Sequence, residues 1–185
     1  LLSAVRSVSQ GHSASLFTCN VAWRLVVPVT ERLHRLVPLD ASVWVGPGRH
    51  AVTYYLRRGE LINFVGVVER SDWQKESWTE EGVVTDLRAD YAGWAEPITE
   101  VIAQAQTCYR WALFDRDPLP FWSDGRVTLL GDACHPMLPF LAQGAVMAIE
   151  DAWVLARKLK ASQEDLPKVL ATYEGARKPR TSRVQ

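Results

Sequence analysis

One stretch of the chain gathers residue types that could bind a polar ligand. Residues 126–152 are RVTLLGDACHPMLPFLAQGAVMAIEDA, in which an apolar run ends at Gly131 and Asp132 and a turn with two prolines follows. The apolar run predicts a strand buried on both faces, and ligands of open α/β sheets bind just beyond the carboxyl ends of such strands. The Asp132 carboxylate could therefore accept hydrogen bonds from a polyol or ribose; alternatively, it only caps a tight strand-to-helix turn.

The same stretch predicts a helix that opens at Gln143 and Gly144. The first N–H groups of a helix have no acceptor within it and together carry about half an elementary positive charge. Because glycine has no side chain to cover them, a ligand can touch these groups directly. We therefore expect this helix start to stabilise an anion or a developing negative charge.

A second candidate set lies in the segment HAVTYYL, residues 50–56. Alternation along a strand places His50, Val52 and Tyr54 on one face, so two titratable side chains point toward the same region. The alternative is that His50 is a solvated residue at the end of the strand, beside the GPG turn.

The elements that must position these residues follow from the sequence pattern. β-branched and aromatic residues predict strands at 17–29, three times within 42–70, and at 108–117. Two short helices are expected within 83–106, and a long helix from about 142 to 159 carries Ile149, Trp153 and Ala156 at helical spacing. A further helix is expected to begin with Ser162 as its cap. The fold class predicted is α/β (α+β), an antiparallel sheet followed by strand–turn–helix.

Composition excludes several classes of function. The chain has 185 residues, and its 21 Lys and Arg balance 21 Asp and Glu, so neither nucleic acid nor a membrane surface is an expected partner. No apolar run reaches the roughly 18 residues of a membrane span. The cysteines, Cys19, Cys108 and Cys134, match no metal-ligand spacing, which favours thiols in a reducing cytoplasm and no metal site. The opening LLSAVRSVSQ lacks the features of a signal peptide, and we interpret the chain as a fragment.

The segment GDACHPMLPFLAQGAVMAIEDA resembles a flavin-contact motif of group A FAD-dependent aromatic monooxygenases, which include salicylate and 3-hydroxybenzoate hydroxylases. The matching residues are Gly131, Asp132, Ala133, His135, Pro139, Gln143, Gly144, Glu150 and Asp151. NVAWRLVVP, VTYYLRRGELINFVGVVE, RWALFDRDPLPFW and YEGARKPRTSRVQ are also similar to the second half of such enzymes. The sequence contains no strand–Gly-x-Gly-x-x-Gly–helix pattern to hold the ADP pyrophosphate.

The resemblance implies a monooxygenase of the PHBH-like fold that uses FAD, NAD(P)H and dioxygen to hydroxylate a small aromatic substrate through a flavin hydroperoxide. It implies that Asp132 contacts the ribityl chain and that the backbone at Gly144, Ala145 and Val146 faces the pyrimidine end of the flavin. Gly131, which allows a close approach, and Pro139, which stiffens the loop, would belong to the same cofactor-binding set. His135 is expected to brace the loop between Asp132 and Pro139; the alternative is a second catalytic base. By the same resemblance, the catalytic residues would be His50 as base or proton relay, Tyr54 as phenolic contact and Gln143 beside the ring.

Three segments follow from this resemblance. Residues 1–16 would end a first FAD-domain segment, 17–115 would form the substrate-binding sheet, and 116–185 would return to the FAD domain. Assembly of the protein into a homodimer is left as an alternative to a monomer. Two other interpretations also remain, namely a catalytically inactive remnant that acts as a binding surface and a flavin-linked reductase without oxygen chemistry.

Overall fold

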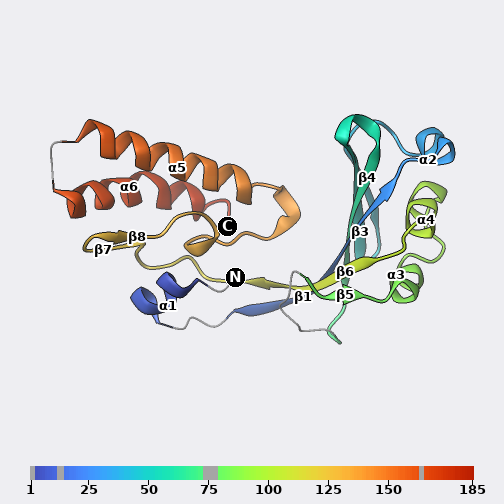
Figure 1. Cartoon of the computed structure of the whole chain (residues 1–185). Coiled ribbons are helices and arrows are strands. Elements are labelled where there is room, and N and C mark those ends of the chain that lie inside the picture. The colour runs from blue at the N-terminus through green and yellow to red at the C-terminus, as the bar shows by residue number, and fades with distance from the viewer. Residues whose placement is uncertain (1–2, 12–14, 73–78, 163–164) are drawn as a thin grey trace. The chain divides into compact units, whose positions relative to one another are not determined.

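The computed structural model describes residues 3–11, 15–72, 79–162 and 165–185. The chain splits into two compact units (Figure 1). One unit comprises residues 1–16 together with 114–185, and the other comprises residues 17–113. We call them the helical unit and the sheet unit.

The sheet unit is built on six strands in the order β2-β3-β4-β1-β6-β5. Their bounds are β1 Leu16–Pro28, β2 Ser42–Gly46, β3 Arg49–Leu56, β4 Leu61–Glu69, β5 Glu81–Gly82 and β6 Cys108–Asp115. The pairs β2–β3, β3–β4, β1–β4 and β5–β6 are antiparallel. The turn between β2 and β3 contains Gly48 at φ +65°, where a residue with a side chain would be strained. The predicted antiparallel sheet is confirmed.

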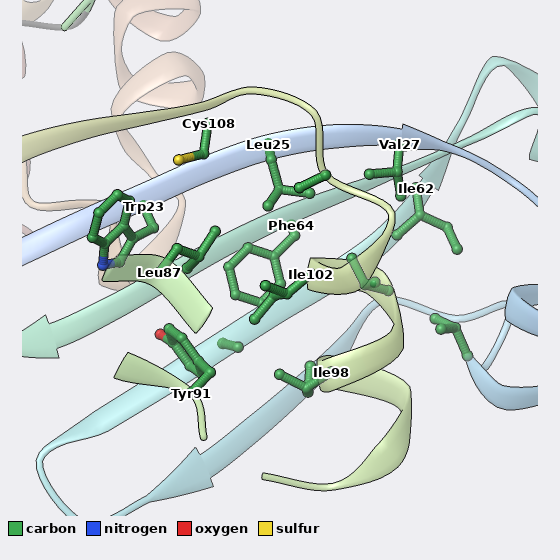
Figure 2. Packing of buried hydrophobic residues seen from close by; sticks show 14 of the residues in the cluster. Trp23, Leu25, Val27, Ile62, Phe64, Leu87, Tyr91, Ile98, Ile102 and Cys108 are labelled. Carbon is green, nitrogen blue, oxygen red and sulfur yellow. The ribbon is translucent and has the colours of Figure 1, made fainter. Parts of the chain in front are cut away.

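Three helices of the sheet unit pack with the sheet around one core. They are α2 Glu31–Leu36, α3 Val84–Asp90 and α4 Glu96–Ala103, and Pro97 lies in the first turn of α4, where its missing N–H costs nothing. Figure 2 shows this core, which joins alternate strand residues such as Trp23, Leu25 and Phe64 to Ile98 of α4. The alternate residues on the other side of the strands include exposed side chains, among them Val26, Val43, Val45 and Tyr54. We call that side the open face.

The helical unit contains α1 Ala4–Gln10, α5 Gly144–Ala161 and α6 Leu166–Thr181. A short hairpin, β7 Ser123–Asp124 with β8 Val127–Thr128, precedes two turns of 3-10 helix, η2 Gly131–Ala133 and η3 Pro139–Leu141. α5 and α6 pack side by side (Figure 1). Their core cluster consists of Leu119, Trp122, Leu129, Cys134 and Tyr173.

The predicted strand at 126–130, buried on both faces, is wrong. β8 covers only Val127–Thr128, Val127 is 46% exposed and Leu130 40%, and only Leu129 is buried. Among the described strands β8 pairs with β7 alone, so it belongs to a short hairpin rather than to a sheet covered on both faces.

The long helix expected from about 142 to 159 is α5; its buried residues are Met147 and Asp151, and Ile149 and Trp153 are exposed. One expectation about the helices needs correction. α6 begins at Leu166 after Asp165 rather than at a Ser162 cap. No helix in the described ranges is both long enough and apolar enough to cross a membrane.

Candidate functional site

A tight turn after β8 brings Gly131 against helix α5. Gly131 has φ +58°, and a Cβ atom at this position would lie 3.1 Å from the Cβ of Ala148. Both the left-handed backbone and the close approach therefore require glycine. The hydrogen bonds from the N–H groups of Cys134 and His135 to the Gly131 carbonyl, each 3.0 Å, close the turn.

The buried carboxylate of Asp151 anchors this turn to the helical pair. Asp151 is 0% exposed. Its Oδ2 accepts the Gly131 N–H at 2.8 Å and bonds His135 Nε2 at 2.5 Å, while its Oδ1 accepts from Arg177 Nε at 2.7 Å. Burial alone would raise the pKa of this carboxyl, but the hydrogen bonds from His135 and Arg177 outweigh it and lower the pKa. Asp151 is therefore an ionised brace that links the turn, α5 and α6.

Two further charged residues complete this network. Arg177 is 4% exposed and donates through Nη1 to Glu150 at 2.6 Å. Arg180 also binds Glu150, through Nε and Nη2, at 2.8 Å each. The hydrogen bond from Arg180, with that from Arg177, lowers the pKa of Glu150 to about 2. We call Glu150, Asp151, Arg177 and Arg180 with His135 the brace network.

The ring of His135 is part of this brace, which agrees with the loop-bracing role expected for it. It is 1% exposed, its centroid lies 5.3 Å from that of Trp122, and its Nδ1 has no hydrogen-bond partner among the described residues. Cys134, His135 and Asp151 together could offer three ligand atoms to a metal ion. However, burial raises the pKa of the Cys134 thiol, and Asp151 already faces the Arg177 guanidinium. This set of donors fits a structural network better than a cation site.

The start of α5 is open, and the carboxylate of Asp132 lies beside it. Asp132 is exposed, and its Oδ1 would lie 3.8 Å from a Cβ atom on Gly144; apart from the backbone of α5 and the chain neighbours of Gly144, no other described atom lies within 4 Å of that position. No described side chain caps the helix, whose first residues include the exposed Ala145 and Val146. The first N–H groups of α5 therefore lie uncovered next to an acceptor that can hold a hydroxyl group.

The turn before α5 places Pro139 and Gln143. Pro139 begins η3, and Ala142 after it has φ 51°, a left-handed conformation that is uncommon for a residue with a side chain. Gln143 occupies the N-cap position of α5 without capping it. Gln143 also lines a cavity of about 110 Å³ with Met137, Leu138, Phe140, Val184 and Gln185.

The sheet unit holds the other two predicted catalytic residues on its open face. His50 lies opposite Val67 of β4, and Tyr54 opposite Asn63. Burial lowers the pKa of His50, which favours the neutral form of its imidazole. On the same face, Arg24 stacks 5.7 Å from the ring centroids of both Tyr109 and Trp111.

A family model described as "FAD binding domain" matches residues 53–185, from β3 to the last described residue. The match covers the Gly131 turn, the start of α5 and the brace network. The chain belongs to this family. The resemblance to group A aromatic monooxygenases is thereby confirmed, and FAD is the cofactor of the family.

Proteins of known activity resemble the chain over most of its length. It is 44% identical to a 3-amino-4-hydroxybenzoate 2-monooxygenase of Streptomyces platensis over 141 residues, which are 76% of this chain and 36% of that protein. It is 39% identical to a 3-hydroxybenzoate 6-hydroxylase of Polaromonas naphthalenivorans over 98% of this chain and 45% of the other. The crystal structure of Klebsiella pneumoniae HpxO with FAD and uric acid superposes with a TM-score of 0.84 at 30% identity, covering 97% of this chain and 46% of the other. The chain therefore spans about half the length of these relatives.

The brace network is the part of this FAD-family site that sequence reasoning did not find. Glu150 and Asp151 were matched to the family motif without a role, and Arg177 lies 26 residues beyond Asp151 on another helix. One feature of the sequence could have indicated it. Asp151 lies one helical turn after Met147, so the two side chains fall on the same face of the predicted helix, and that face is the buried one. Aspartate and arginine are rarely buried unless they are paired, so a basic partner on the next helix could have been sought.

Proposed function

We propose that this chain supplies the substrate sheet and the flavin-ring contacts of an FAD- and NAD(P)H-dependent monooxygenase that hydroxylates a hydroxybenzoate-like aromatic compound. One observation carries the proposal: the uncapped start of α5 lies beside Asp132, within a segment that matches the FAD binding domain family. An uncovered helix start and a hydroxyl acceptor side by side suit a ligand with an anionic end and a polyol chain.

In this proposal Asp132 accepts a hydrogen bond from a hydroxyl of the ribityl chain. The N–H groups at Gly144, Ala145 and Val146 face the pyrimidine end of the flavin, which is anionic when the cofactor is reduced, and the helix dipole lowers the energy of that form. Gly131 and Pro139 fix the loop between the two contacts. When bound, the cofactor supplies reduction by NAD(P)H and the activation of dioxygen.

The substrate would rest on the open face of the sheet. The neutral His50 imidazole can accept the proton of a phenol, which makes the ring more nucleophilic. Tyr54 would contact the phenolic oxygen, and Gln143 would hydrogen-bond near the ring. The relatives named above act on aminohydroxybenzoate and hydroxybenzoate, which supports a ring with hydroxyl and carboxylate substituents.

The cofactor contact is tested by FAD titration of the complete product of the gene that encodes this chain. Asp132→Ala is expected to weaken FAD binding about ten- to hundredfold, since a hydrogen bond to a charged group is lost. Asp117→Ala is the matched control, because Asp117 is also an exposed aspartate of the helical unit. Equal FAD affinity in the Asp132→Ala and Asp117→Ala variants would falsify the assignment.

The reaction is tested with the same complete product and a panel of hydroxybenzoates. A hydroxylase consumes dioxygen and NAD(P)H faster when its substrate is present and releases a hydroxylated product. A flavin-linked reductase oxidises NAD(P)H without releasing such a product, and an inactive remnant does neither. A cytoplasmic location fits the three free cysteines, and light scattering of the purified protein tests the homodimer.

A further inference from the structure

Asn63 occupies the centre of β4 on the open face of the sheet. It lies directly opposite Tyr54 of β3 on one side and Val26 of β1 on the other. Although Tyr54 is 37% exposed and Val26 47%, Asn63 itself is only 5% exposed. A polar side chain is therefore held deep between neighbours that are open to solvent.

The side-chain amide nitrogen of Asn63 donates no hydrogen bond to the described part of the fold. Its Nδ2 has no hydrogen-bond partner in the part of the chain that the structure describes. Two other polar side chains of the sheet unit find their partners within the fold: Trp44 Nε1 donates to Thr53 Oγ1 at 3.0 Å, and Asn20 Nδ2 donates to the Thr18 carbonyl at 2.9 Å. A buried donor without an acceptor destabilises the fold, so its position calls for a partner that comes from outside.

The surroundings of Asn63 define that partner. Side chains directly opposite each other on antiparallel strands have Cβ atoms about 5 Å apart, so the side chains of Tyr54 and Asn63 leave the sheet next to each other on the open face. Both groups can donate a hydrogen bond. Val26 lies beside Asn63, and the next row of the same face holds Val52, Val65 and Arg24. Two donors beside apolar side chains and a cation suit a flat ring that carries an anionic group.

We propose that Asn63 donates a hydrogen bond to the carboxylate of the aromatic substrate and, with Tyr54, selects the acid over its amide. This inference rests on the proposed function and deepens it, because it names the residue that sets the substrate class. Asn63 binds the substrate equally before and during the reaction, so its contribution falls on KM and not on kcat.

The test measures KM and kcat of the complete gene product with 3-hydroxybenzoate, 4-hydroxybenzoate and salicylate, each beside its carboxamide. Asn63→Leu is expected to raise KM for the preferred acid about ten- to hundredfold with kcat nearly unchanged. Asn63→Asp is expected to reverse the preference toward the carboxamide, because a carboxylate repels the acid and accepts the N–H groups of the amide.

The melting temperature separates this role from a structural one. Thr53→Val removes a hydrogen bond on the helix-covered face and is expected to lower the melting temperature without changing KM. Asn63→Leu is expected to keep or raise the melting temperature, because it removes an unsatisfied buried donor. A fall in melting temperature with unchanged KM in Asn63→Leu overturns the inference.

The outcome is also distinguishable from a failure of the proposed function. If no aromatic acid stimulates NAD(P)H oxidation in the unaltered protein, the proposed function fails, and tryptophan fluorescence then measures 3-hydroxybenzoate binding directly. Weaker binding in Asn63→Leu supports the inference in that case. Equal binding by both proteins, or no binding by the unaltered protein, overturns it. If oxidation is stimulated and acid-over-amide selectivity survives in both Asn63 variants, only the inference fails.

Discussion

Replacing Asp151 by asparagine tests whether the buried carboxylate holds the Gly131 turn. The carboxylate receives three donors, from Gly131, His135 and Arg177, at 2.8, 2.5 and 2.7 Å. An asparagine of the same shape offers only one acceptor oxygen, and its NH₂ group must face a donor. The change therefore removes a charge and creates a clash between hydrogen-bond donors in a site that water does not reach.

The loss of stability expected for Asp151→Asn depends on the contacts that Arg177 keeps in the variant. Removing one partner of a buried ion pair costs about 3–5 kcal/mol. Glu150 still accepts from Arg177 at 2.6 Å in the variant, so part of the buried positive charge stays compensated. We expect a loss near the lower limit, about 3 kcal/mol, which corresponds to a fall of roughly 6–12 °C in melting temperature for a chain of this size.

Urea unfolding followed by circular dichroism at 222 nm measures the loss, because α5 and α6 contribute much of the helical signal. Asp165→Asn is the control, since Asp165 is an exposed residue at the start of α6 that makes no capping hydrogen bond, and a change within about 0.5 kcal/mol is expected there. Hydrogen exchange of the Gly131 amide gives a local measurement and should lose its protection only in Asp151→Asn. Equal stability of the two variants, with Gly131 still protected, would refute the bracing role.

Three further outcomes follow from the same geometry. Gly131→Ala should cost about 2 kcal/mol in chemical unfolding, since it combines a left-handed backbone with the 3.1 Å approach to Ala148, whereas Gly175→Ala inside α6, with open space around it, should gain about 0.5–1 kcal/mol. The pKa of Glu150 is depressed to about 2, so its stabilisation is complete above the unfolded value near 4.3 and disappears as the pH falls toward 2. Acid unfolding of Glu150→Gln should therefore lose part of its pH dependence in that window. Burial lowers the pKa of His50, so the acidic limb of kcat/KM for the complete gene product should have its midpoint below 6.5, and His50→Gln should lose this limb with a rate about a hundredfold lower or more.

The sheet unit was largely predictable from the sequence, because local rules decide it. Alternation of β-branched and aromatic residues defines β1, β3 and β4, and the period of two places His50 and Tyr54 on one face. The GPG turn fixes where β2 ends and β3 begins. The position of Gly131 was also predictable as a close approach, although the sequence did not say that the approach is to Ala148.

What could not be predicted depends on partners distant in the chain. The apolar run at 126–130 has the composition of a fully buried strand, but burying both faces requires other elements packed on each side of the sheet, and Val127 and Leu130 remain exposed. The pairing of Asp151 with Arg177 joins two helices, and no local pattern encodes which arginine is chosen. Asn63 fits an alternating strand like any other outward residue, and only its 5% exposure reveals that it is buried.

The rigid turn and the open helix start are parts of one arrangement. A helix start attracts any nearby carboxylate as a cap, and a cap would occupy the N–H groups that a ligand needs. Asp132 is the carboxylate next to Gly144, yet it does not cap α5. The turn on which Asp132 sits is fixed by the bond from the Gly131 N–H to Asp151, so the brace holds Asp132 beside the helix start and keeps it from closing that start. A ligand that brings both an anionic edge and a hydroxyl chain would satisfy the helix start and Asp132 at once, and the Asp151 brace holds the turn in place before such a ligand arrives.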